Sequence, residues 1–394
     1  MTFSNRISAM KPSAIREILK APNDPDLISL AAGNPSPETF PAQEMAEIAA
    51  GIFSRNYAAA LQYGVTEGYE PLRVRTARRL SGKYALGREF DQLIITSGAQ
   101  QAIELSAKVL TNEGDVVLCE DPSFIGALGA LRSYNVRLAG VPSRDDGSGM
   151  DMDALEAALK TTPNVKLIYT IPTYQNPTGS VMPEASRKRL LELAKQYDVM
   201  ILEDNPYFEL RYDGEYIPPV KALDTEGRVI YAGSFSKIIA PGIRLGFALG
   251  PEPVTQKMVV GKQVSDVHSN LFFQILCDRY LEQYDIDGHI EKCNALYKLR
   301  RDTMVESLQR HLSDKLRWRV PHGGFFLWCE RLDNGDGAEF SAAAKAHKVM
   351  TVPGAAFLVD DTQKSPGVRL NFSLPNPAQI EEGVRRIAAA VERI

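Results

Sequence analysis

The sequence predicts an α/β protein with a mostly parallel central sheet in a large domain and a smaller α+β domain. First, its 394 residues exceed the roughly 250–300 that one hydrophobic core usually serves, so two domains are expected. Second, apolar runs of strand length alternate with amphipathic helical stretches through the middle of the chain, which favours a parallel sheet covered by helices. Third, the pattern changes from about Asp285 onward, where a charged helix precedes short strands.

The elements of the large domain are expected in alternating order along the chain. Apolar, β-branched runs predict strands over residues 92–96, 115–119, 166–171, 199–202 and 228–232. Helices are expected from residue 97, over 153–159 with an acidic first turn, and after Pro183, which suits a helix start. Every predicted strand is therefore separated from the next by a turn or by a helix.

The domain boundaries follow from the change of pattern. We expect a large domain over residues 46–284. The smaller domain is expected to be discontinuous, combining an N-terminal arm over 1–45 with 285–394. Within it, a charged helix passes through Arg300 and Arg301, and short strands lie near 323–328.

Composition excludes several classes of protein. A chain with 44% hydrophobic and 24% charged residues is neither disordered nor fibrous, and a net charge of -4 argues against a nucleic-acid surface. No apolar run is long enough to span a bilayer, and no secretory signal is expected in the charged first thirty residues. Four widely spaced cysteines suit reduced thiols in a cytoplasm, with neither a disulfide framework nor a metal site.

The most informative segment is the run Gly-Ser-Phe-Ser-Lys that ends at Lys237. It follows the predicted strand over 228–232, and open α/β sheets bind their ligands at such strand ends. Ser234, Ser236 and Arg244 offer two hydroxyl donors and a permanent cation, which suit a phosphate. A lysine beside a phosphate site indicates a cofactor held as a Schiff base, pyridoxal phosphate. The alternative is a surface turn with an incidental lysine.

Three other strand ends carry polar or aromatic residues suited to a flat, anionic cofactor. The backbone at the helix start formed by Ser97, Gly98, Ala99 and Gln100 would face a phosphate. Phe124 follows the strand over 115–119 and could stack on a heterocycle, and Asn176 precedes a proline after the strand over 166–171. Taken singly, each has an ordinary alternative: an N-cap serine, a core phenylalanine and a common Asn-Pro turn.

A fourth strand end carries Glu203 and Asp204 next to each other. Adjacent strand residues face opposite sides, so only one of the two carboxylates can enter a shared pocket, and we expect it to be Asp204. A buried carboxylate needs a positive partner, which a pyridinium N–H would supply. The alternative is an exposed acidic pair. Lys237 must be partly unprotonated to attack a carbonyl, and burial with nearby cations would lower its pKa.

Taken in order, these residues resemble the sites of fold-type I pyridoxal phosphate enzymes, and the chain is similar to the class I and II aminotransferases from near its start to its end. The resemblance implies that Lys237 binds the cofactor covalently, Asp204 pairs its ring nitrogen, and Phe124 stacks on its ring. It further implies phenolic-oxygen contacts from Asn176 and Tyr207, a phosphate site of Ser97, Gly98, Ala99, Gln100, Ser234, Ser236 and Arg244, and a substrate-carboxylate role for Arg369. Tyr63 resembles the tyrosine that reaches a neighbouring subunit's phosphate, which implies a homodimer with shared sites.

Within the superfamily, the chain resembles the 2-aminoadipate and kynurenine aminotransferase group. Arg16 occupies the position at which some members hold a substrate's distal carboxylate; its alternative is a solvent-facing helix arginine. Phe124 stands where many relatives have tyrosine. The Ala-Gly-Asn-Pro turn around Gly33, which we place in the substrate site, replaces a more glycine-rich turn.

The resemblance implies a ping-pong aminotransferase that moves an amino group from a 2-aminoadipate, aromatic or aliphatic donor to a 2-oxo acid such as 2-oxoglutarate. Its partners would be these small molecules, with no nucleic acid and no membrane. Because one cofactor site serves several bond cleavages, a β-lyase or decarboxylase stays open as an alternative. A ligand-sensing regulatory domain is a third interpretation, although no basic helix-turn-helix precedes the aminotransferase-like region.

Overall fold

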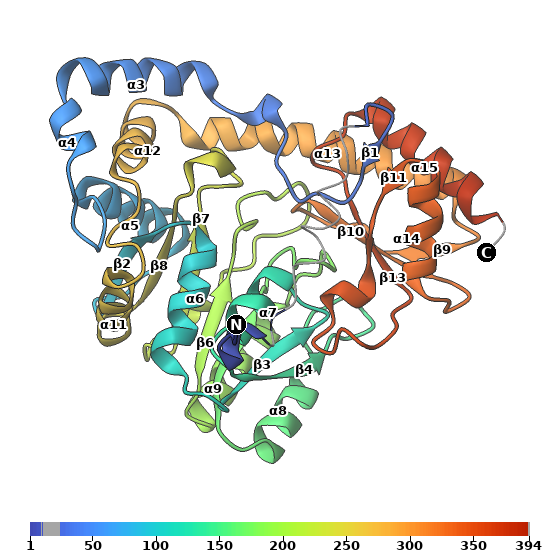
Figure 1. The fold of residues 1–394 in the computed structure, drawn as a ribbon, viewed down its shortest axis with the longest axis horizontal. Coiled ribbons are helices and arrows are strands. Elements are labelled where there is room, and N and C mark those ends of the chain that lie inside the picture. The colour runs from blue at the N-terminus through green and yellow to red at the C-terminus, as the bar shows by residue number, and fades with distance from the viewer. Residues whose placement is uncertain (9, 11–23, 393–394) are drawn as a thin grey trace.

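The computed structural model describes residues 1–8, 10 and 24–392 (Figure 1). Arg16 therefore lies outside the described residues. Among the described residues, no helix combines the length and apolar character needed to cross a membrane.

A seven-stranded sheet forms the centre of the large unit, in the order β2-β8-β7-β6-β5-β3-β4. Its strands are β2 (Asp91–Thr96), β3 (Val116–Asp121), β4 (Arg137–Pro142), β5 (Val165–Thr170), β6 (Met200–Asp204), β7 (Val229–Ser234) and β8 (Gly246–Pro251). Only β8 runs antiparallel to its neighbours, and the other strand pairs are parallel. The predicted α/β class with a mostly parallel sheet is confirmed.

Two strands of this sheet have no counterpart in the sequence-based prediction. Strand β4 is mostly exposed or half-buried, so its residues lack the continuous apolar run of a central strand. Strand β8 is fully buried, but it contains Gly246, Gly250 and Pro251, which weaken a strand signal. Both strands form because neighbouring strands supply hydrogen-bond partners, and the local sequence of β4 or β8 does not indicate that pairing.

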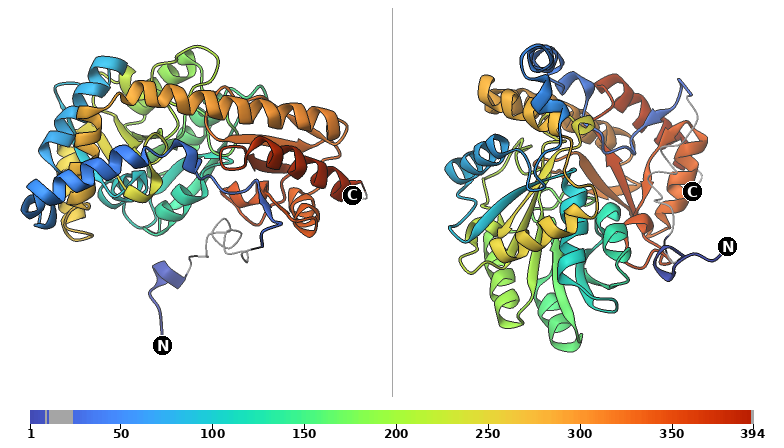
Figure 2. Two further views of the ribbon diagram at one scale, coloured as in Figure 1. Left: turned by 90° about the horizontal axis from the view of Figure 1, so that it is seen from above. Right: turned by 60° about the vertical axis from the view of Figure 1, so that its left-hand side comes forward.

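Helices cover both faces of the sheet (Figure 2). They are α3 (Ala42–Arg55), α4 (Tyr57–Leu61), α5 (Glu70–Tyr84), α6 (Ala99–Leu110), α7 (Ile125–Arg132), α8 (Met152–Thr161), α9 (Glu184–Gln196), α10 (Val220–Leu223), α11 (Glu252–Gln263) and α12 (Leu271–Gln283). Each face of the sheet has its own hydrophobic core, because successive side chains of a strand point to opposite faces. On β2, Ile94 packs with α6 and α11, whereas Ile95 packs with α5 and α12. This double cover leaves the strand ends as the open edge of the large unit.

The C-terminal part of the chain forms a second, antiparallel sheet of four strands in the order β12-β13-β10-β9. Its elements are α13 (Ile286–His311), β9 (Leu316–Trp318), β10 (Phe326–Arg331), α14 (Gly337–Ala346), β12 (Val352–Pro353), β13 (Gly367–Asn371) and α15 (Pro377–Val391). A separate pair joins β1 (Ile28–Ser29) to β11 (Val349–Met350). Short helices complete the list: α1 (Asn5–Ser8), η1 (Pro37–Thr39), η2 (Pro241–Ile243) and η3 (Gly354–Phe357).

We propose a division into two domains close to the predicted one. The boundary between 284 and 285 coincides with Asp285, whose side chain caps the start of α13. The predicted boundary between 45 and 46 falls inside α3, so we move it to before Ala42. Pairing of β1 with β11 ties the N-terminal segment to the smaller domain.

Candidate active site

The ends of β5, β6 and β7 lie side by side because these three strands are parallel neighbours. Asn176 and Lys237 lie on the segments after β5 and β7, Asp204 is the last residue of β6, and β13 of the smaller sheet brings Arg369 to the same place. Residues far apart in the sequence thus meet at one edge of the large sheet, as expected for a ligand site in an open α/β fold.

Lys237 follows β7, and its amine lies close to Gly33, Tyr207 and Phe325. Its Nζ donates a hydrogen bond to the backbone oxygen of Gly33 at 2.8 Å. It lies 5.7 Å from the centre of the Tyr207 ring and 5.5 Å from that of Phe325. Burial, and then the positive charges of Arg369 and Arg244, lower the pKa of Lys237 to about 8. A substantial neutral fraction near pH 8 suits a nucleophilic amine.

Asp204 ends β6 and is 2% exposed. Its Oδ2 accepts a hydrogen bond from the Tyr169 hydroxyl at 2.8 Å, whereas its Oδ1 is buried with no partner among the described residues. Burial raises the pKa of Asp204 to about 7. A buried carboxylate oxygen with nothing to accept from marks a position for an external N–H donor.

Glu203 precedes Asp204 and lies on the opposite side of the strand. It is fully buried, and its two oxygens accept from the backbone N–H groups of Val220 and Lys221 at 3.1 and 2.8 Å. The Asn205 amide adds a third bond at 3.2 Å. The structure therefore has Asp204 on the Lys237 side, as expected, and neither carboxylate is the exposed group of the alternative interpretation.

Arg369 lies on β13 and is 1% exposed. Its guanidinium donates to Asn176 Oδ1 at 2.9 Å and to the Ala31 oxygen at 2.6 Å, while its Nε has no partner among the described residues. The ring centres of Phe326 and Phe357 lie 4.1 and 4.8 Å from its Cζ atom. Burial lowers the pKa of Arg369 to about 9. A cation held this way can receive a carboxylate.

Tyr207 and Phe124 lie on the segments that follow β6 and β3. The Tyr207 ring is buried and packs edge-on against Phe325 and Phe326, at centroid distances of 5.4 and 5.7 Å. Phe124 immediately precedes α7 and is half-buried; a Cβ added to Gly126 would lie 2.4 Å from its ring. Gly126 therefore leaves room for the Phe124 ring beside α7.

The predicted phosphate site is formed by the start of α6 and the segment after β7. Gly98 adopts a φ of +81°, and a Cβ there would lie 2.5 Å from a guanidinium nitrogen of Arg244. Glycine is thus required where Arg244 approaches the helix start. Ser234 Oγ accepts from the Ser236 backbone N–H at 3.1 Å, which shapes a tight turn before Lys237. The free N–H groups of a helix start and an arginine together favour an anion.

Two members of the predicted phosphate set use their side chains elsewhere. The Ser97 hydroxyl donates to Asp266 at 2.7 Å and contacts the Ser269 hydroxyl at 2.9 Å, so its one proton is committed away from Arg244. The Gln100 amide donates to the Gly126 oxygen at 2.8 Å. The phosphate roles predicted for Ser97 and Gln100 rest on backbone N–H groups at this helix start and not on these side chains, and they stay predictions.

Two of the remaining predicted residues, Gly33 and Tyr63, are among the described residues. Gly33 presents its backbone oxygen to Lys237, and a Cβ on Gly33 would lie 2.9 Å from the Phe326 ring. Tyr63 is 81% exposed and contacts the neighbouring His268 ring edge-on at 5.9 Å. Arg16 lies outside the described residues.

Sequence reasoning missed three residues that complete the site. Tyr169 pairs with Asp204, and Phe326 and Phe357 enclose Arg369. The only local signal was a tyrosine inside an otherwise aliphatic strand, since a buried tyrosine hydroxyl needs a partner. Nothing local linked either phenylalanine to an arginine in another segment.

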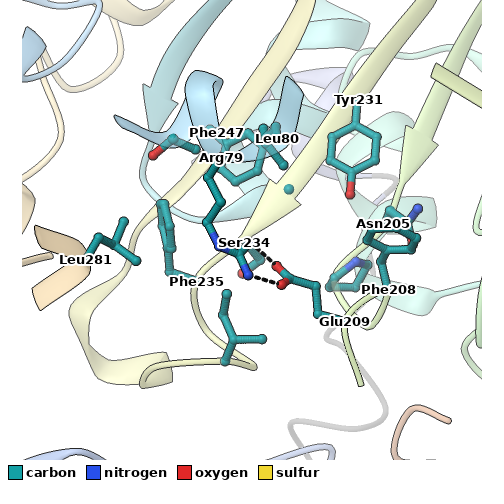
Figure 3. A pocket seen from close by; sticks show the side chains of 14 residues that line it. Arg79, Leu80, Asn205, Phe208, Glu209, Tyr231, Ser234, Phe235, Phe247 and Leu281 are labelled. Carbon is teal, nitrogen blue, oxygen red and sulfur yellow. Dashed lines mark hydrogen bonds and ion pairs between the residues drawn. The ribbon is translucent and has the colours of Figure 1, made fainter. Parts of the chain in front are cut away.

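A small cavity lies behind these strand ends, next to α5 and α12 (Figure 3). Asn205 and Ser234 line it, and the ion pair between Arg79 and Glu209 closes one side. Asp204 and Lys237 do not line this cavity. The cavity therefore adjoins the site at Ser234 without including those two residues.

The site fits pyridoxal phosphate on the evidence of its own donors and acceptors. The unpaired Oδ1 of Asp204 suits the ring N–H, the amine of Lys237 suits the aldehyde, and Arg244 beside the start of α6 suits the phosphate. These three groups of the protein complement three different parts of the same cofactor.

Comparison with known proteins decides the family. Residues 25–387 match the family model for aminotransferase class I and II. The chain belongs to this family. Aromatic-amino-acid aminotransferase 1 of Thermococcus litoralis is 41% identical to the enzyme over 392 residues, covering 99% of this chain and 94% of that protein.

Solved structures agree with this assignment. The kynurenine aminotransferase of Pyrococcus horikoshii, in complex with PMP, KYN as substrates and KYA as products, has a TM-score of 0.94 and 40% identity, covering 99% of this chain and 96% of that chain. The alpha-aminoadipate aminotransferase of Thermus thermophilus, complexed with N-(5'-phosphopyridoxyl)-L-leucine, has a TM-score of 0.90 and 34% identity, covering 99% and 97%.

These findings establish a fold-type I, pyridoxal phosphate-dependent aminotransferase that acts on small-molecule amino acids. The predicted family, fold, cofactor and enzyme class are confirmed. The β-lyase, decarboxylase and regulatory interpretations find no support among these relatives.

Proposed function

We propose that the enzyme moves the amino group of an aromatic, aliphatic or 2-aminoadipate-like donor to a 2-oxo acid, with 2-oxoglutarate as the favoured acceptor, in a ping-pong reaction. The relatives named above for aromatic amino acids, kynurenine and alpha-aminoadipate support this range of donors. The observation that carries the proposal is that the Lys237 amine lies within the electrostatic influence of both Asp204, which has an unpaired oxygen, and the Arg369 guanidinium.

In this proposal, Lys237 and Asp204 hold and activate the cofactor. Pyridoxal phosphate, when bound, supplies the electron sink that lets an amino acid lose its Cα proton. Asp204 keeps a positive partner at its Oδ1, which strengthens that sink. The Lys237 Nζ, with its pKa of about 8, would accept the proton that the amino acid loses from Cα and donate it again later in the reaction.

The same proposal assigns substrate orientation to Arg369 and phosphate binding to the segment after β7. The planar guanidinium of Arg369 receives the α-carboxylate through paired hydrogen bonds, and Asn176 holds it in place from behind. Arg244, Ser234, Ser236 and the backbone of Gly98 to Gln100 bind the phosphate. Phe124 would stack on the cofactor ring, Asn176 and Tyr207 would bind its phenolic oxygen, and Gly33 would border the substrate.

A donor screen tests this function. Each of the twenty common amino acids, 2-aminoadipate and kynurenine is mixed with the holoenzyme and 2-oxoglutarate, and the new 2-oxo acid and glutamate are both measured. Equal amounts of the two products are expected for several donors. Release of ammonia or carbon dioxide without glutamate would overturn the proposal.

Arg16 is proposed to select dicarboxylates. The Arg16→Gln variant is expected to weaken the use of 2-aminoadipate and glutamate while sparing leucine and phenylalanine, because only the first two carry a distal carboxylate. Comparing kcat/KM for the four donors checks this. Equal losses for all four would dismiss Arg16 as a selector.

We also propose a homodimer with shared sites. Large apolar side chains are exposed on α3, α4, α11 and the segments after them: Phe53, Tyr57, Leu61, Tyr63, Val65, Val260, Val264 and Val267. Contacts between Phe53 and Phe272, and between Tyr63 and His268, join these segments into one surface. Such a patch favours association with a second copy, whose phosphate Tyr63 would reach.

Sedimentation of the wild type and of Tyr63→Phe tests the dimer. Both are expected to sediment as dimers, and Tyr63→Phe is expected to release the cofactor faster because it lacks the phenolic donor. A wild-type monomer would overturn the shared site. We further propose a cytoplasmic location, which the four free, buried cysteines favour; cell fractionation tests it.

A further inference from the structure

Two loops that carry proposed cofactor-site residues are joined by buried hydrogen bonds. Glu120, near the end of β3, accepts from the Thr170 hydroxyl at 3.0 Å and from the Ile171 backbone N–H at 2.9 Å. The Gln175 amide adds a weaker contact at 3.4 Å. These bonds connect the end of β3 with the end of β5 and the segment that follows it.

Gln175 uses both ends of its side chain in this connection. Its Nε2 donates to the Pro122 oxygen at 2.9 Å, within the loop after β3. Its Oε1 accepts from the Thr178 backbone N–H at 2.8 Å and from the Thr178 hydroxyl at 2.7 Å, within the loop after β5. The Gln175 side chain therefore lies between the two loops and is bonded to both.

The loops that Glu120 and Gln175 join carry Phe124 and Asn176. Phe124 lies two residues beyond Pro122, and Asn176 follows Gln175 directly. Asn176 Oδ1 in turn accepts from Arg369, so the connection continues to the proposed carboxylate site. If the two loops moved relative to each other, the distance between Phe124 and Arg369 would change.

Burial of the Glu120 carboxyl group between these two loops costs free energy, because the group loses its hydration. Glu120 is 1% exposed, it pairs with no lysine or arginine within the described residues, and burial raises its pKa to about 7. An apolar pair of similar volume at such a place is often as stable as a buried polar one, or more so. Fixed geometry, which directional hydrogen bonds provide and apolar contacts do not, is a sufficient reason for a carboxyl group here.

We propose that Glu120 and Gln175 are positioning residues that fix the Phe124 loop against the Asn176 loop, and so keep the cofactor ring and Arg369 in the geometry required for transamination. This inference rests on the proposed function. Neither residue is assigned contact with substrate or cofactor.

The Glu120→Gln variant tests the proposal, because an amide keeps only one acceptor oxygen and must turn its NH2 group toward the Thr170 hydroxyl or toward the Ile171 and Gln175 donors. Glu203→Gln is the matched control, since Glu203 is also fully buried but bonds the backbone of Val220 and Lys221 instead of the loops after β3 and β5. Holoenzyme is diluted, and cofactor release is followed by absorbance and by visible circular dichroism. KM and kcat for one donor are measured in parallel.

For Glu120→Gln we expect cofactor affinity to fall about tenfold and the donor KM to rise about tenfold, with a smaller change in kcat. The visible dichroism of the bound cofactor is expected to shrink, because the ring is held less firmly. For Glu203→Gln, affinity and KM are expected to stay within about threefold of wild type. Unchanged affinity and dichroism in Glu120→Gln, or equal losses in the control, would overturn the proposal.

Two milder variants keep the test decisive if Glu120→Gln does not fold. Gln175→Met preserves length but removes both hydrogen-bonding ends, and Thr170→Val removes a single bond to Glu120. We expect losses in the order Gln175→Met, then Thr170→Val; wild-type behaviour in both would overturn the proposal. A wild-type protein that binds cofactor but makes no glutamate would instead contradict the proposed function and leave these affinity measurements interpretable.

Discussion

The two sides of the end of β6 place neighbouring carboxyl groups in opposite situations. Glu203 is saturated by two backbone N–H groups and the Asn205 amide. Asp204 has one hydroxyl partner and one buried oxygen with none among the described residues. Burial raises the pKa of both groups. The first arrangement is complete within the chain, whereas the second is completed only by a ligand.

This contrast separates a structural carboxyl group from a functional one without reference to the reaction. Both groups are buried, charged in the free amino acid and adjacent in sequence, so burial alone cannot distinguish them. The pairing of their oxygens does. The predictions below ask whether that difference in pairing becomes a difference in chemistry.

The largest effect is expected from removal of the Lys237 amine. Lys237→Ala should abolish turnover and the visible absorbance of the bound cofactor, because Lys237 is the lysine whose charge acts on Asp204. Absorbance after reconstitution and single-turnover assays check this. Wild-type turnover in the variant would refute the assignment of Lys237.

Asp204→Asn and Glu203→Gln test directly whether the two carboxyl groups differ in function. Asp204→Asn should lower kcat/KM by about 10²–10³-fold, because a neutral amide cannot stabilise a positive ring nitrogen. Glu203→Gln should keep kcat but lose about 1–3 kcal/mol of unfolding free energy, because a buried donor loses its acceptor. Parallel kinetics and urea unfolding measure both. Equal kinetic losses in the two variants would remove the distinction.

Arg369→Ala extends the test to the other cation of the site. We expect kcat/KM to fall about 100-fold for every amino-acid donor, because each carries the α-carboxylate and loses two charge-assisted hydrogen bonds. Kinetics with leucine, phenylalanine and glutamate check this. A loss confined to one donor would make Arg369 a side-chain selector instead.

Asp204 should also destabilise the cofactor-free protein in a pH-dependent way. Its pKa is raised from 3.8 to about 7, so between these values the folded state holds the proton that the unfolded state has released. The free energy of unfolding of the cofactor-free wild type should therefore fall as the pH rises from 4 to 7. At pH 8, the free energy of unfolding of cofactor-free Asp204→Asn should be higher than that of the wild type, by at most about 4 kcal/mol. Urea unfolding at pH 5 and pH 8 checks this; no difference at either pH would contradict it.

The smallest effect is expected from Tyr169→Phe. The hydroxyl bond lowers the pKa of Asp204, so the variant should raise that pKa and weaken the charged form. A single hydrogen bond contributes about 0.5–1.5 kcal/mol, which predicts a two- to tenfold fall in kcat. The acid limb of the kcat–pH profile should move to higher pH. A profile that moves to lower pH would refute this role.

The sequence predicts five of the seven strands of the large sheet, and the structure shows why. Strands β2, β3, β5, β6 and β7 each contain an apolar run that is buried. The exposed β4 and the glycine-containing β8 gave no such signal. Strand-end residues such as Asp204 and Lys237 could be expected together because parallel strands share an edge.

What escaped prediction depends on contacts between distant segments. The hydroxyl of Ser97 bonds to Asp266, 169 positions away, and Arg369 lies against Phe326 and Phe357. Glu120 and Gln175 are 55 positions apart and meet only because β3 and β5 are neighbours in the sheet. No local periodicity records such pairings.

The aromatic enclosure of Arg369 has a consequence for selectivity. The guanidinium of Arg369 is already shielded from water by Phe326 and Phe357 in the folded protein. An amino acid therefore binds a cation that is fixed in position and dehydrated before binding. An amine without an α-carboxylate would leave that cation dry and unsatisfied. Simple alkylamines, even those with an ideal side chain, should therefore be rejected far more strongly than amino acids whose side chains fit poorly.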